Sequence, residues 1–313
     1  MKKVSFVIPC YRSANTIGVV VDEIRDTMPM LPEYDYEIIL VNDCSPDNTL
    51  EVISALARSD DRIIAVDLAK NFGQHAALMS GISHSTGDFV VCLDDDGQTP
   101  ANEVGKLLAR LEQDDCDVAM ASYEHKQHSA FRNFGTKLNN RMTEIMLGKP
   151  RDLSMTSYFA IKRFVVDEML KYKNCFPYLD GLILRCTRRI RTVPVQHRAR
   201  MEGSSGYTLG KLFALWMDGF TAFSVKPLRL ASIFGALTAF AGFIYTIVII
   251  IKHFIYSDIP TGWSSTMALQ LILGGVILLV LGLVGEYIGR IYMCINAAPQ
   301  YVERSVIRRG DGE

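Results

Sequence analysis

Residues 88–98 read Asp-Phe-Val-Val-Cys-Leu-Asp-Asp-Asp-Gly-Gln, an apolar strand-like run that ends in three consecutive carboxylates. Ligands of open α/β sheets bind beyond the carboxyl ends of the strands, where Asp94, Asp95 and Asp96, here called the acidic triplet, would lie. Adjacent carboxylates repel each other and favour a cation. Mg²⁺ or Mn²⁺ suits oxygen ligands and commonly shares them with substrate phosphates. A solvated surface loop is the alternative for such a run taken alone.

The segments around the triplet predict an α/β fold with a mostly parallel sheet and helices on both faces. Strand patterns are expected at 4–8, 36–41, 63–68, 88–93 and 117–121, and helix patterns at about 15–27, 47–59, 74–84 and 101–113. Strands that alternate with helices of this length are typical of βαβ units. Neither GxGxxG nor GxxxxGK[ST] occurs, so the motifs of a Rossmann dinucleotide site and of a P-loop are missing.

Composition narrows the class of protein further. The chain has 313 residues, enough for one α/β domain and an addition. Its net charge of −1 gives no signal for a nucleic-acid partner. There are seven cysteines with no CxxC pair, which favours reduced thiols in a protein that faces the cytosol.

The C-terminal third is strongly apolar and predicts two transmembrane helices, at 228–252 and 267–291. Roughly 20 apolar residues span a bilayer core, although a buried core hairpin is the alternative. The loop between the two runs has only Lys252 at its edge, whereas cations gather outside both runs: Arg188, Arg189, Arg191, Lys226, Arg229, Arg290, Arg304, Arg308 and Arg309. The positive-inside rule therefore predicts that both termini are cytoplasmic.

These observations predict a five-part layout. Residues 1–206 would form a cytoplasmic catalytic domain, and an amphipathic pattern at 207–227 predicts a helix in the membrane interface. The two spans follow, and then a cytoplasmic tail at 292–313. The tail alternates like a strand over 299–307, and a lone strand has unpaired edges. We therefore expect the tail to join subunits of a homo-oligomer, with a disordered tail as the alternative.

Three predicted strand ends carry groups that suit a nucleotide. The first strand ends at Tyr11, the second at Asp43 and the fourth at the acidic triplet. The Tyr11 ring could stack on the base of a nucleotide, and the Asp43 carboxylate could accept a base N–H or a ribose hydroxyl. A metal ion at the acidic triplet could bind the diphosphate of the nucleotide. Taken singly, Tyr11 and Asp43 are ordinary turn residues.

Four ordered segments resemble the GT-A fold of family 2 glycosyltransferases: VSFVIPCY (4–11), VNDCSPDNT (41–49), KNFGQHAALMSG (70–81) and LDDDGQTP (93–100). The resemblance is closest to the branch that loads a sugar onto a polyprenyl phosphate. That branch includes dolichol-phosphate mannose synthases, bactoprenol glucosyltransferases and undecaprenyl-phosphate aminoarabinose transferases. Residues 197–231 and 285–292 match the same branch, so the resemblance covers almost the whole chain. It also suggests a tetramer.

The resemblance implies a role for each matching position. The implied nucleotide-binding residues are Pro9, Tyr11, Ser13, Asp43, Lys70, Asn71 and Asp94. The implied catalytic residues are Asp94, Asp95, Asp96, Gln98 and Asp152, of which Asp94, Asp96 and Gln98 would hold Mg²⁺ or Mn²⁺. Two departures stand out: Tyr11-Arg12-Ser13 replaces the usual Tyr-Asn-Glu, and Gly97 precedes Gln98 where the family commonly has Leu.

The acceptor side is expected to bind an anionic lipid head. Arginine holds phosphate with a planar fork of donors, and the implied acceptor residues are Arg132, Arg200, Ser205 and Tyr207. The cluster Arg188–Arg191 fits a lipid-headgroup patch better than a catalytic role.

The expected reaction is an inverting transfer from a nucleotide-diphosphate sugar, expected to be a UDP-sugar, to a polyprenyl phosphate such as undecaprenyl phosphate. It would take place at the cytoplasmic face of a bacterial inner membrane and give a polyprenyl-monophosphate sugar for glycan or lipid modification. Asp95 or Asp152 would be placed to orient the attack. One alternative is extension of a polysaccharide, although such synthases usually carry a QxxRW-like segment and more spans. Another is a membrane-anchored nucleotide-sugar sensor without catalysis.

Overall fold

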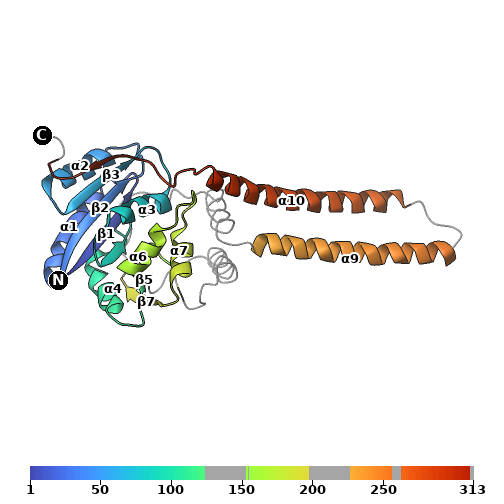
Figure 1. Cartoon of the computed structure of the whole chain (residues 1–313), viewed down its shortest axis with the longest axis horizontal. Helices are drawn as coiled ribbons and strands as arrows, with labels where there is room; N and C mark the ends of the chain where they lie inside the picture. Colours follow the sequence, from blue (N-terminus) through green and yellow to red (C-terminus); the bar gives the residue numbers. More distant parts are fainter. Residues whose placement is uncertain (124–152, 154, 197–225, 256–261, 311–313) are drawn as a thin grey trace. The chain divides into compact units, whose positions relative to one another are not determined.

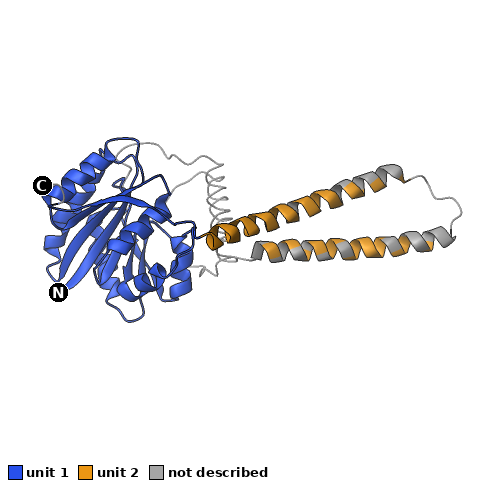
Figure 2. Ribbon diagram, turned by 45° about the horizontal axis from the view of Figure 1, so that its top comes forward, with its two compact units in different colours: residues 1–212, 297–313 blue, residues 213–296 orange. Residues whose placement is uncertain are grey.

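The computed structural model describes residues 1–123, 153, 155–196, 226–255 and 262–310. The chain forms two compact units (Figure 2). Unit 1 comprises Met1–Leu212 and Ala297–Glu313, and unit 2 comprises Phe213–Asn296. The predicted interfacial helix, 207–227, lies outside the described residues except for its last two, which begin a helix of unit 2.

Unit 1 is built on one eight-stranded sheet with the order β7-β5-β6-β4-β1-β2-β3-β8 (Figure 1). The strands are β1 Lys2–Cys10, β2 Tyr34–Asn42, β3 Ile63–Leu68, β4 Phe89–Cys92, β5 Val118–Tyr123, β6 Phe159–Lys162, β7 Ile190–Val195 and β8 Glu303–Ile307. Strands β4, β1, β2 and β3 run parallel, as do β5 and β7. Only β6 and β8 run against their neighbours. The mostly parallel sheet is therefore confirmed.

Helices cover both faces of this sheet. They are α1 Ile17–Thr27, α2 Thr49–Ser59, α3 Gln74–His84, α4 Val104–Leu111, α6 Arg163–Leu170 and α7 Leu179–Cys186, with short 3₁₀ turns at Met28–Met30 and Ala101–Glu103. Alternate β1 residues such as Phe6 and Ile8 join the core cluster that holds α1, α2 and α4. Val7 faces the other way, against Gly81 of α3. A Cβ at Gly81 would overlap with Val7, so this glycine lets α3 lie close to the sheet.

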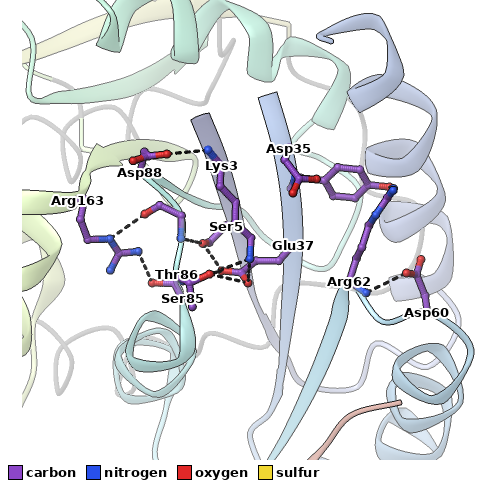
Figure 3. Close-up of polar contacts among 12 residues, drawn as sticks. Lys3, Ser5, Asp35, Glu37, Asp60, Arg62, Ser85, Thr86, Asp88 and Arg163 are labelled. Carbon is purple, nitrogen blue, oxygen red and sulfur yellow. Dashed lines mark hydrogen bonds and ion pairs between the residues drawn. The ribbon is translucent and has the colours of Figure 1, made fainter. Parts of the chain in front are cut away.

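A buried carboxylate ties the strands together at the amino end of the sheet (Figure 3). Glu37 of β2 is 6% exposed and accepts hydrogen bonds from Ser5 Oγ at 2.6 Å, Lys3 Nζ at 2.7 Å and the Thr86 backbone N–H at 2.6 Å. Burial alone would raise the pKa of Glu37. The hydrogen bonds from Lys3, Ser5 and Thr86 outweigh burial, and the pKa is lowered. This cluster stabilises the end of the sheet opposite the acidic triplet.

The C-terminal tail returns to unit 1 as a strand. β8 pairs antiparallel with β3, with Ala65 opposite Ile307 and Asp67 opposite Ser305. The strand-like pattern of the tail is thus confirmed, but the expectation that it pairs with another subunit is wrong for this strand. β3 would otherwise leave its own edge unpaired, and the tail of the same chain satisfies it. The oligomer, tetramer included, stays a prediction.

The described part of unit 2 consists of two long helices, α9 Lys226–Ile255 and α10 Trp263–Ile295, which contact each other. Within the described part of the chain, one helical stretch, Leu273–Ile295, is long and apolar enough to cross a membrane. Large apolar side chains on both helices are exposed, among them Phe240 and Phe243 of α9 and Leu278 of α10. Exposed apolar surface of this kind is typical of a face that contacts a membrane or another protein.

Candidate active site

The β3–α3 loop closes around Asp43, the residue that follows β2. The backbone N–H groups of Phe72 and Gly73 donate to its two carboxylate oxygens over 2.7 and 2.9 Å. The side-chain amide of Asn71 donates to the backbone carbonyl of Asp43 over 3.2 Å. Gly73 has φ 87°, a conformation that glycine adopts without strain. Burial raises the pKa of Asp43 even though both N–H groups favour its charged form. Asp43 therefore organises this loop, and the Asn71 side chain contacts its backbone.

The three carboxylates of the acidic triplet have different hydrogen-bond partners. Asp94 accepts a hydrogen bond from Gln74 Nε2 over 2.9 Å and another from Ser157 Oγ. Asp95 accepts the backbone N–H of Tyr11 over 3.0 Å. Asp96 accepts the backbone N–H of Gln98 over 3.0 Å. The triplet is therefore a junction of strand ends and not a solvated surface loop.

Asp95 joins the end of β4 to the end of β1. Burial raises the pKa of its carboxyl to about 6, and the charges of Asp94 and Asp96 push it the same way. The Tyr11 N–H and the neighbouring Ser13 side chain counter part of this shift. Asp95 thus holds the turn that begins at Tyr11, a contact that the sequence does not predict.

Tyr11 is the part of the first motif that remains accessible. Its side chain is 45% exposed, and the Arg12 guanidinium carbon lies 5.6 Å from the ring centroid. Arg12 has φ 58°, and its N–H donates to Ser45 Oγ over 2.7 Å. Ser13 is only 2% exposed, and its N–H donates to Thr49 Oγ1 over 3.0 Å. The Tyr11 ring is therefore accessible from solvent, whereas the Ser13 side chain is buried.

Some of the remaining predicted residues lie in the described part of the chain, and the others lie outside it. Pro9 lies within β1, and Lys70 is exposed with its Nζ 4.9 Å from the ring centroid of Phe72. Gly97 has φ 71°, which explains why a glycine stands before Gln98. The predicted residues that lie outside the described part of the chain are Arg132, Asp152, Arg200, Ser205 and Tyr207.

Three residues near the triplet were missed. Gln74 and Ser157 bind Asp94, and the charges of Asp94 and Asp96 reinforce burial in raising the pKa of Tyr123 at the end of β5. Gln74 lies in the segment KNFGQHAALMSG (70–81), one of the four that resemble the family, so the sequence contained a signal for it. Ser157 gives no such signal, because only the antiparallel direction of β6 brings the residues before it to this edge.

The donor set at this edge suits a hard cation that is shared with a substrate. Over the described ranges, no three His, Cys, Asp or Glu side chains converge on a metal position. Asp94 and Asp96 offer carboxylate oxygens, and a Mg²⁺-type ion completes its shell with water and substrate phosphates when a protein supplies one or two carboxylates. The residues present therefore fit a metal that arrives with a diphosphate.

Comparison with known proteins agrees with this geometry. Residues 5–170 match the model of "Glycosyl transferase family 2", and residues 226–291 match the "GtrB C-terminal hairpin". The undecaprenyl-phosphate 4-deoxy-4-formamido-L-arabinose transferase of Yersinia enterocolitica is 33% identical over 98% of this chain and 94% of its own. Its Klebsiella pneumoniae counterpart is 32% identical over 99% and 95%.

A solved structure is similar in fold over most of this chain. Glucosyl-3-phosphoglycerate synthase from Mycobacterium tuberculosis, solved with Mn²⁺ and UDP-glucose, matches with a TM-score of 0.50 and 19% identity over 70% of this chain and 77% of that one. The strand ends, the family model and the full-length relatives lead to one conclusion: this chain belongs to glycosyl transferase family 2.

Proposed function

We propose that this protein transfers a sugar from a nucleotide-diphosphate sugar, a UDP-sugar in our assignment, to undecaprenyl phosphate with inversion at the anomeric carbon. The observation that carries the proposal is the edge at which β1, β2 and β4 end. There, an exposed ring, a loop-binding carboxylate and the acidic triplet lie together. Similarity over the full length to relatives named as undecaprenyl-phosphate transferases supports the acceptor.

The nucleotide would lie across the ends of β1, β2 and β3. Tyr11 would stack on the base, and Asp43 would accept a base N–H or a ribose hydroxyl, since a carboxylate oxygen that already accepts one hydrogen bond keeps a free lone pair. Lys70 is exposed in the loop that Asp43 organises, where its charge would face the diphosphate. Asp94 would approach the ribose or the diphosphate, with Gln74 and Ser157 holding its orientation.

Asp94, Asp96 and Gln98 would hold the metal, Mg²⁺ or Mn²⁺. When bound, such an ion stabilises the charge that develops on the leaving diphosphate. The Gln98 N–H fixes one oxygen of Asp96, and the left-handed Gly97 permits that turn. Asp95 keeps the Tyr11 turn against the triplet, so the base-stacking and metal-binding parts of the site are held together.

The acceptor residues in our proposal are Arg132, Arg200, Ser205 and Tyr207, on the family resemblance. The phosphate oxygen of the lipid would attack the anomeric carbon. Because that phosphate is already ionised near neutral pH, no strong general base is required, and Asp152 would serve only to orient the attack.

We place the protein in a bacterial inner membrane, with α9 and α10 as two spans and both termini in the cytoplasm. The exposed apolar side chains of both helices and the match to a C-terminal hairpin support this topology. Residues 1–206 would be the catalytic domain, 207–227 an interfacial helix and 292–313 a cytoplasmic tail. A homo-oligomer remains part of the proposal.

A radiolabelled transfer assay tests the function. Membranes with the protein, undecaprenyl phosphate and a panel of labelled nucleotide sugars should give label in a lipid-monophosphate fraction. Label in a polymer would instead support polysaccharide extension, and binding without turnover would support a sensor. The panel also identifies the sugar.

A further inference from the structure

The C-terminal tail contacts the elements on both sides of the β3–α3 loop that binds Asp43. On the β3 side, the Ala69 N–H donates to the Val302 carbonyl over 2.8 Å. On the α3 side, Ser80 Oγ donates to Glu303 Oε1 over 2.7 Å, and His84 Nε2 lies 3.0 Å from Glu303 Oε2. Residues 70–73 therefore connect β3 to α3, and the tail makes hydrogen bonds at the end of β3 and to α3.

Arg304 sits where the pairing of β8 with β3 shifts register. Asp67 pairs with Ser305 and Leu68 with Glu303, so Arg304 is the extra residue of a bulge. Bulges re-aim side chains and are common beside active sites. Here the Arg304 guanidinium donates to the Ala69 carbonyl over 3.0 Å and lies 3.5 Å from the buried Asp67 carboxylate.

A line of polar contacts continues from Asp67 to the first motif. Asn42 Nδ2 donates to the other oxygen of Asp67 over 2.8 Å, and Asn42 Oδ1 accepts the Ser45 N–H over 3.2 Å. Ser45 Oγ in turn accepts the Arg12 N–H over 2.7 Å. The Arg304 guanidinium thus contacts Ala69, the last residue before the Asp43-binding loop, directly. Through Asp67, Asn42 and Ser45 it is also linked to the turn at Arg12, next to the exposed Tyr11 ring.

We propose that Arg304 is a positioning residue for the nucleotide site: it fixes the ends of β2 and β3, so that the tail which follows the second long helix is needed for tight nucleotide binding. The inference rests on the proposed function for the identity of the ligand. Its structural half, that Arg304 orders residues 69–73, is inferred from its contacts to Ala69 and Asp67 and does not depend on which nucleotide binds.

The test uses the full chain in detergent, with Arg304→Ala, Arg304→Lys and the control Arg309→Ala. Arg309 is exposed in the same tail but lies beyond β8. Hydrogen exchange by mass spectrometry follows the amides of residues 69–73, and those of β1 and β2 report whether each variant is folded. Titration calorimetry with UDP and Mn²⁺ measures nucleotide affinity.

In Arg304→Ala, we expect faster exchange at residues 69–73 and a Kd for UDP that rises roughly three- to tenfold, since an exposed charged donor to the Ala69 carbonyl and to the buried Asp67 carboxylate is lost. Arg304→Lys should recover part of both effects, and Arg309→Ala should match the wild type. In transfer assays, KM for the nucleotide sugar should rise while KM for the lipid phosphate stays constant.

Unchanged exchange at residues 69–73 in both Arg304 variants would overturn the proposal. So would faster exchange with an unchanged Kd for UDP, because the loop would then be ordered without consequence for the nucleotide. If the wild type does not bind UDP, the nucleotide assigned under the proposed function is wrong, and the exchange measurement alone then decides the role of Arg304.

Discussion

Replacing Asp43 with asparagine should loosen the β3–α3 loop while leaving the shape of the site almost unchanged. The two carboxylate oxygens of Asp43 accept the N–H groups of Phe72 and Gly73 over 2.7 and 2.9 Å. Asparagine has one acceptor oxygen and one NH₂ group, so it can receive only one of them, and the other N–H faces a donor. An unpaired backbone N–H costs about 1–3 kcal/mol when buried. The Asn71 contact to the Asp43 carbonyl survives, because it involves the backbone.

That cost sets the expected size of the effect. The loop should open roughly fivefold to a hundredfold more often, since 1.4 kcal/mol corresponds to a factor of ten. If the closed loop is the form that binds nucleotide, its loosening should raise the Kd for UDP by at most the same factor. Any weakening of the proposed direct contact between Asp43 and the nucleotide would add to that rise. Hydrogen exchange at Phe72 and Gly73 measures the first quantity, and calorimetry with UDP and Mn²⁺ measures the second.

Asp61→Asn is the matched control, because Asp61 is an exposed aspartate in the turn before β3. Its exchange and nucleotide affinity should equal those of the wild type. Wild-type exchange at Phe72 and Gly73 in Asp43→Asn would refute the reasoning, since the two hydrogen bonds would then contribute nothing to the loop.

Three further outcomes follow from the site and the sheet. Asp96→Ala should lower transfer at least about a hundredfold with the fold intact, because a metal that stabilises the leaving group is worth several kcal/mol; near-normal turnover of the purified variant with Mg²⁺ or Mn²⁺ would rule out its role. Arg200→Ala should raise KM for lipid phosphate far more than KM for nucleotide sugar, because a charge-assisted bond is worth roughly 1.5–3 kcal/mol; a rise confined to the nucleotide sugar would contradict the acceptor assignment. The lowered pKa of Glu37 means that its ionised form stabilises the folded state above the normal value of 4.5, and that this stability is lost as the pH falls through the lower folded-state pKa. Thermal unfolding in detergent between pH 7 and pH 3 should therefore show a smaller loss of stability in Glu37→Gln than in the wild type, and equal losses would exclude the effect.

Local sequence was sufficient to predict most of the βα order and to propose a set of candidate site residues. The helices were predicted at about 15–27, 47–59 and 74–84, and α1, α2 and α3 begin and end within two residues of those bounds. This agreement reflects hydrophobic periodicity, which depends on neighbours within a few turns of chain. Tyr11, Asp43 and the acidic triplet could be grouped because parallel strands bring their carboxyl ends to one edge.

The directions in which the side chains of the acidic triplet point could be learned only from the tertiary structure. The sequence shows three adjacent carboxylates, but not that Asp95 turns back to the Tyr11 N–H while Asp94 meets Gln74. Each direction depends on how neighbouring turns pack, and residues next to each other in the chain can have unrelated partners. The Ser157 contact to Asp94 joins residues that are 63 positions apart.

The C-terminal tail shows most clearly which features local sequence predicts and which depend on tertiary contacts. The alternation at 299–307 was sufficient to predict a strand, because a period of two is a local property. Its partner was predicted wrongly, since any unpaired edge, in this chain or another, offers the same row of N–H and C=O groups. Only the folded chain shows that β3 is that partner and that the register shift gives Arg304 its contacts to Asp67 and Ala69. The sequence by itself determined which segments are strands and which residues are candidates for the site, whereas pairing, register and side-chain direction were decided by contacts between segments far apart in the chain.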